Sequence, residues 1–94
     1  MSPEEELVRA GEARQMLDSR IFIEASQRVI EGLAAQRKQV PIRDTDMHTK
    51  LIMSEQLWLS IQGWLEQTAE TGKFAEFSIR QREAQKKGLF GVFK

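Results

Sequence analysis

The fold of this chain is decided by residues 51–65, which read LIMSEQLWLSIQGWL. Their apolar residues recur at α-helical spacing, which predicts a helix over residues 45–71. One row on this helix comprises Met47, Leu51, Trp58, Ile61 and Leu65. A second row, about 100° to one side, comprises Met53, Leu57 and Trp64, and Ile52 and Leu59 lie on the other side. A helix this widely apolar needs cover on more than one side, from the other helices of the chain or from a second subunit.

Two further helices are predicted before this one. Ser2 and Pro3 form a helix start, because serine caps the free amides and proline suits the first helical position. A second helix is expected over residues 20–38. The residues on its apolar face are Phe22, Ala25, Val29 and Leu33. Pro41 requires this helix to end before it, and Asp44 is the cap expected for the helix that follows.

The last part of the chain is predicted to break the long helix. Gly72 is typical of a helix terminator, so residues 73–87 are expected to form a separate, shorter helix. The two glycines after residue 87 argue against a stable helix in the tail. The predicted fold is therefore all-α, an antiparallel hairpin of two long helices with a shorter N-terminal helix and a shorter C-terminal helix. A single helical domain covers residues 1–87, and residues 88–94 form an apolar and basic tail.

The residue chemistry argues against an enzyme. The chain has 94 residues with no cysteine and one histidine, which excludes a disulfide, a thiolate nucleophile and a cysteine-ligated metal. Asp44 and His48 are spaced to meet on one helix face, but such a pair is more often a local cap or ion pair than a catalytic dyad. A structural zinc wants four ligands, and this pair offers two or three at best. We expect no cofactor, no metal and no enzymatic activity.

Neither a secretory signal nor a membrane span is expected. The chain opens with acidic residues rather than a basic segment, and polar side chains interrupt its most apolar stretch, residues 51–65. These features predict a protein of the cytoplasm that does not bind membranes.

Charge is distributed unevenly, although the formal net charge is zero. Residues 44–72 hold five acidic side chains and one basic one, a net charge of −4. Residues 73–94 hold six basic and two acidic ones, a net charge of +4, together with four of the five phenylalanines. The C-terminal end is therefore basic and aromatic, whereas the central helix is acidic.

This basic end allows several interpretations. The first expectation is that it folds back over the acidic helix and that its phenylalanines complete the core. Alternatively it is a partner-binding tail, in which Phe90 and Phe93 insert into a groove of another protein and nearby lysines steer the encounter. It could also contact nucleic-acid phosphates, while seven tail residues are few for a membrane anchor. The candidate nucleic-acid-binding residues are Arg80, Arg82, Lys86 and Lys87.

Two short segments carry a resemblance to a known group of proteins. Residues 9–17 read RAGEARQML, and residues 65–75 read LEQTAETGKFA. Together they resemble a group of small, all-helical tailed-phage and prophage proteins, whose genes lie among packaging and head genes. The resemblance spans about residues 9–76. It implies an accessory role and brings no catalytic residues with it.

Two functions are therefore expected. The first is a non-enzymatic phage or prophage accessory protein in virion assembly or DNA packaging, located in the bacterial host cytoplasm or on the virion. It would act by helix-mediated association with itself or with a larger phage structural or packaging protein. The second is a nucleic-acid-binding packaging or regulatory subunit that uses the basic end. The candidate partner-binding residues are Met53, Leu57, Trp64, Phe90 and Phe93.

Overall fold

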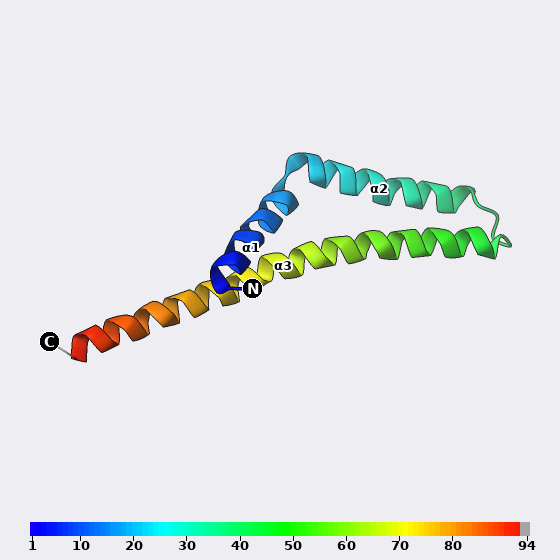
Figure 1. Cartoon of the computed structure of the whole chain (residues 1–94). Helices are drawn as coiled ribbons and strands as arrows, with labels where there is room; N and C mark the ends of the chain where they lie inside the picture. Colours follow the sequence, from blue (N-terminus) through cyan, green and yellow to red (C-terminus); the bar gives the residue numbers. More distant parts are fainter. Residues whose placement is uncertain (93–94) are drawn as a thin grey trace.

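The computed structural model describes residues 1–92, with side chains for residues 1–88, and confirms an all-α fold. It contains α1 (Pro3–Asp18), α2 (Arg20–Gln39) and α3 (Thr45–Val92), and no strand within residues 1–92 (Figure 1).

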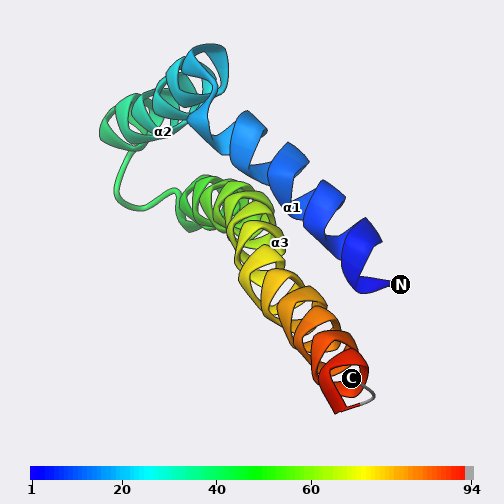
Figure 2. The same cartoon turned by 90° about the vertical axis from the view of Figure 1, so that its left-hand side faces the viewer.

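Local capping fixes the start of each of the three helices. Ser2 Oγ accepts the Glu5 amide at 3.2 Å, with Pro3 in the first turn, as the sequence predicts. Ser19 ends α1 and also caps α2, so a single residue joins the two helices and turns the chain (Figure 2). Asp44 Oδ1 accepts the Met47 amide at 3.1 Å and opens α3. These caps satisfy amides that have no partner inside a helix.

α3 is one helix of 48 residues, so the predicted break at Gly72 is wrong. There is no separate, shorter C-terminal helix in residues 73–92, and the helix also passes through Gly88 into the predicted tail. A terminating glycine uses positive φ, and none of the described glycines does. Gly72 is instead buried inside the helix, where its missing side chain makes room for α1.

The molecule is a thin rod rather than a globule. Its dimensions are 78 × 25 × 15 Å, and its radius of gyration is 21.6 Å. A compact chain of this length would have a radius of about 12 Å. α1 crosses the middle of α3, α2 runs beside its first half, and the last part of α3 projects beyond both (Figures 1 and 2).

The apolar core is correspondingly narrow. Its buried apolar residues are Ala10, Ala13, Leu51, Leu65 and Ala75. Among residues 1–88, no large side chain is fully buried. The fold therefore leaves most of its large apolar side chains in contact with solvent.

Candidate protein-protein interface

α1 and α3 meet through their smallest residues. Ala10 and Ala13 are the buried residues of α1, and Gly72 and Ala75 lie on the facing side of α3. A Cβ atom added to Gly72 would lie 2.5 Å from the Ala10 Cβ, so the two backbones are in direct contact there. Larger residues would hold the helices apart.

Two polar contacts from the first half of α1 fix how it lies on α3. Glu4, in the first turn of α1, forms an ion pair with Arg82 of α3. Further along α1, the Arg9 guanidinium lies 6.0 Å from the centre of the Trp64 ring, a cation–π distance. The beginning of α1 therefore lies near the later part of α3, and the two helices run in opposite directions.

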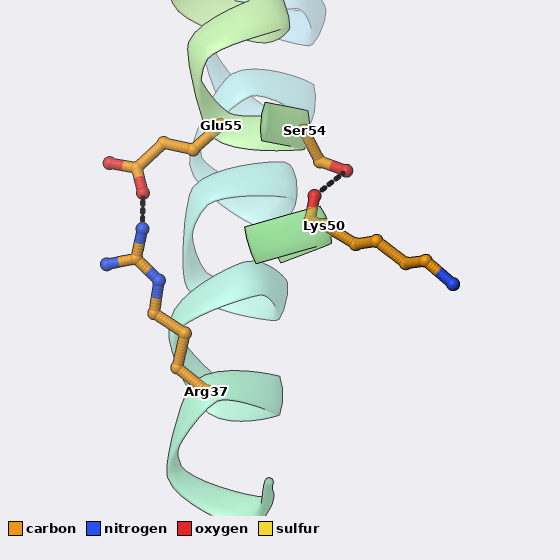
Figure 3. Close-up of polar contacts among 4 residues, drawn as sticks. All are labelled: Arg37, Lys50, Ser54 and Glu55. Carbon is orange, nitrogen blue, oxygen red and sulfur yellow. Dashed lines mark hydrogen bonds and ion pairs between the residues drawn. The ribbon is translucent and has the colours of Figure 1, made fainter. Parts of the chain in front are cut away.

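α2 contacts the first half of α3 through larger side chains. The Phe22 and Trp58 rings lie 6.1 Å apart between centroids, and Gln62 Nε2 donates a 2.9 Å hydrogen bond to the buried Ser26 hydroxyl. Nearer the turn, Arg37 forms an ion pair with Glu55, as Figure 3 shows. These contacts hold α2 on one side of α3 and leave another side uncovered.

The uncovered side carries an apolar strip, here called the exposed stripe, which comprises Met53, Leu57, Ile61 and Trp64. Leu57 is 66% exposed and Trp64 is 55% exposed. Three of these residues are those that the sequence groups in its second row. Ile61 and Met47 belong to the first row of the sequence analysis, together with the buried Leu51 and Leu65, but both are more than 40% exposed.

The four residues of the exposed stripe are uncharged, and at the Trp64 end the Arg9 guanidinium of α1 lies over the indole ring. Glu55 is the only charged residue between Leu51 and Leu65. It lies about 160° around the helix from Leu57 and is held by Arg37 of α2 (Figure 3). Further along, Glu66 and Glu70 also lie at least about 120° from Leu57 around the helix. The charged and apolar sides of α3 are therefore segregated.

The basic end does not fold back, so the first expectation for it is wrong. It continues α3 outwards, and Phe74 and Phe77 are 73% and 61% exposed instead of completing a core. The reason is that nothing interrupts the helix at Gly72. Of the predicted tail anchors, Phe93 and the side chain of Phe90 lie outside the described residues.

The candidate phosphate-binding residues do not form one basic face. Arg80 pairs with Glu76 at 2.6 Å, and Arg82 is engaged by Glu4. Among the described residues, Lys86 and Lys87 have no acidic partner within 4.0 Å. Helical rotation places Arg82 and Lys86 on one side, roughly 130° from Arg80 and Lys87.

The only histidine serves the turn before α3. His48 Nε2 lies 3.1 Å from the Pro41 carbonyl oxygen, and Asp44 uses its carboxylate as a helix cap. In the described part of the chain, no three histidine, aspartate or glutamate residues cluster so that they could hold a metal ion. Nor does any helix within that part have the length and apolar character that a membrane span requires.

No family model, curated protein or solved structure matches the chain. The resemblance to phage proteins therefore stays a prediction from two short segments. Those segments contribute the two sides of one contact, since Ala10 and Ala13 come from the first, and Leu65, Gly72 and Ala75 from the second. Alanine and glycine at helical spacing in both segments is the signal that could have predicted their pairing.

The accessible surface is much larger than a self-sufficient monomer of this size exposes. The chain has a mass of 10.9 kDa and exposes 7794 Å². A typical folded monomer of that mass exposes about 5,600 Å². The surplus of about 2,200 Å² includes the exposed stripe and the outward-facing phenylalanines of α3.

Proposed function

We propose that this chain is a non-enzymatic association protein that binds another protein through the exposed stripe of α3. The hairpin of α2 and α3 would support the stripe, and α1 packs across α3 at the Trp64 end of the stripe. The observation that carries the proposal is the row of exposed apolar side chains from Met53 to Trp64, because large apolar patches on small proteins mark interaction sites.

The composition of the stripe supports the same proposal. Tryptophan and methionine are enriched at protein interfaces, and charged residues are depleted at interface centres. Trp64 and Met53 fit this description, and the stripe contains no charge. As the resemblance implies, the setting would be phage virion assembly or DNA packaging in a bacterial cytoplasm. This setting rests on the two short segments alone.

A photo-crosslinking amino acid such as p-benzoylphenylalanine tests the proposal. Placed at Leu57, it should form covalent adducts with a protein partner in cells that carry the gene. The matched control is the same amino acid at Leu59, which is 47% exposed but lies about 160° around the helix from Leu57. Adducts at Leu57 and not at Leu59 support the proposal, whereas none at Leu57 would contradict it.

Nucleic-acid binding by the basic end is the alternative proposal. Lys86 and Lys87 are exposed on the part of α3 that projects beyond α1, which favours it. The engagement of Arg80 and Arg82 by carboxylates weighs against it. Binding through phosphates must weaken as salt rises, so a DNA mobility shift at low salt that disappears at high salt would support it. No shift at low salt would exclude it.

A further inference from the structure

We propose that the partner at the exposed stripe is a second copy of this chain, packed antiparallel about a two-fold axis near residues 58 and 59. Met53 of each copy then lies beside the partner's Trp64. This inference rests on the proposed function, since it names the partner of the same surface. The resulting dimer has a four-helix centre built from two pairs of α2 and α3.

The exposed area is sufficient for such a dimer. A standard interface buries about 800 Å² on each partner. The surplus surface of this chain, about 2,200 Å² relative to a typical monomer, exceeds that area. Covering the stripe with a second copy would therefore bring the exposed surface of the chain closer to that of an ordinary folded protein.

The apolar residues of the stripe have nearly the same spacing when α3 is read in either direction, as an antiparallel two-fold pair requires. About an axis between residues 58 and 59, Met53 lies opposite the partner's Trp64, and Leu57 lies opposite the partner's Ser60 and Ile61. Each copy therefore offers four apolar residues to the same four residues of the other. The flexible thioether of Met53 also suits the face or edge of an indole ring.

The charge distribution permits two identical surfaces to meet. A two-fold axis brings each side chain near its own copy, so a charge close to the axis would meet the same charge. The four stripe residues have none, and Arg37 holds Glu55 on the α2 side (Figure 3). The Arg9 guanidinium of α1 lies over the Trp64 ring, at the end of the stripe and away from the axis, so it does not meet its own copy. The other carboxylates of this part of α3, Glu66 and Glu70, face away from the stripe and remain in solvent.

The molar mass in solution is the first test. Light scattering and sedimentation equilibrium should give twice the 10.9 kDa chain mass. Leu57→Asp places two carboxylates near the axis and should raise the dissociation constant by roughly 100-fold, since like charges at an interface cost several kcal/mol. Leu59→Asp, on the other side of α3, should leave the dimer intact. A wild-type chain that stays monomeric at millimolar concentration overturns the inference.

Disulfide trapping tests the register, because a covalent link records which positions meet even when the variants weaken the dimer. The chain has no cysteine, so the introduced cysteine is the only thiol of each variant. An equimolar mixture of the Met53→Cys and Trp64→Cys variants should form a covalent heterodimer under mild oxidation. Neither variant alone should form a covalent homodimer. A link within one chain is excluded, because each variant carries a single cysteine. Homodimers of either variant, or no heterodimer, would overturn the antiparallel register.

The crosslinking experiment at Leu57 separates this inference from the proposed function. Adducts with the mass of two chains support both the second-copy inference and the proposed function. Adducts only with a different protein overturn the second-copy inference and leave the proposed function standing. The lack of any adduct contradicts both.

Discussion

Gly72 of α3 and Ala10 of α1 bring two backbones into contact, and a single methyl group added to Gly72 would lie 2.5 Å from the Ala10 Cβ. An alanine Cβ is attached to the backbone and cannot rotate away. A side chain at position 72 therefore has to push α1 and α3 apart. This contact holds α1 at its crossing with α3, and it gives the sharpest prediction about stability.

Gly72→Ala should lower the free energy of unfolding. Overpacking costs about 1–3 kcal/mol, which alanine's better helix propensity, about 1 kcal/mol, offsets only in part. Gly63→Ala is the matched control, because among the described residues nothing lies within 4 Å of a Cβ added there. It should be neutral or stabilising by up to about 1 kcal/mol. Urea unfolding followed by circular dichroism measures both.

The same pair offers a rescue. Ala10→Gly removes the methyl group that the new alanine would strike, so the double variant should regain part of the stability that Gly72→Ala loses. Equal stability of the Gly72→Ala and Gly63→Ala variants would show that the two helices do not touch at this point.

Trp58 should tolerate replacement by phenylalanine. Its Nε1–H is buried and has no hydrogen-bond partner among the described residues, and an unpaired buried donor costs about 1–3 kcal/mol. Trp58→Phe removes that donor and keeps a ring beside Phe22, so stability should stay within about 1 kcal/mol of the wild type. Trp58→Ala deletes the ring and should cost about 3 kcal/mol, the low end for such a change, because Trp58 is only partly buried. Denaturant midpoints compare the two, and equal losses would argue against the unpaired donor.

The ion pair between Glu4 and Arg82 should contribute little to stability. Both side chains are about half exposed, and exposed pairs are typically worth about 0–1 kcal/mol. Glu4→Gln should therefore lower stability by less than about 1 kcal/mol and speed amide hydrogen exchange mainly in the first turn of α1. The reversed pair, Glu4→Arg with Arg82→Glu, should restore the slower exchange. Faster exchange throughout α1 in Glu4→Gln would mean that the pair, and not the Ala10–Gly72 contact, holds the helix.

Local signals in the sequence predict the helix starts, whereas the continuation of α3 through Gly72 is explained by a contact with a residue distant in the sequence. Ser2, Asp44 and Pro41 act through neighbouring residues, so their roles could be predicted from the sequence. Gly72 looks locally like a helix end, and only its meeting with Ala10 shows why it stays helical.

The exposed stripe was predicted only in part for a related reason. Periodicity assigns Ile61 to an apolar face, but it does not reveal which parts of that face other helices cover. α1 crosses α3 beyond Ile61, and α2 lies on another side, so this residue remains exposed.

Deleting residues 88–94 should separate the roles of the tail and the stripe. Residues 80–88 are all exposed, so this part of α3 adds little packing to the rest of the fold. The truncated chain should keep its free energy of unfolding within about 0.5 kcal/mol, as expected for surface changes away from packed features, and it should still dimerise. Calorimetry and light scattering measure these properties.

If Phe90 and Phe93 anchor a second partner, truncation should remove that partner from crosslinks while leaving crosslinks at Leu57 between two chains. The full-length double variant Phe90→Ala with Phe93→Ala is the control for chain length and should behave like the truncation. A large loss of stability on truncation would instead mean that the tail packs against the helices.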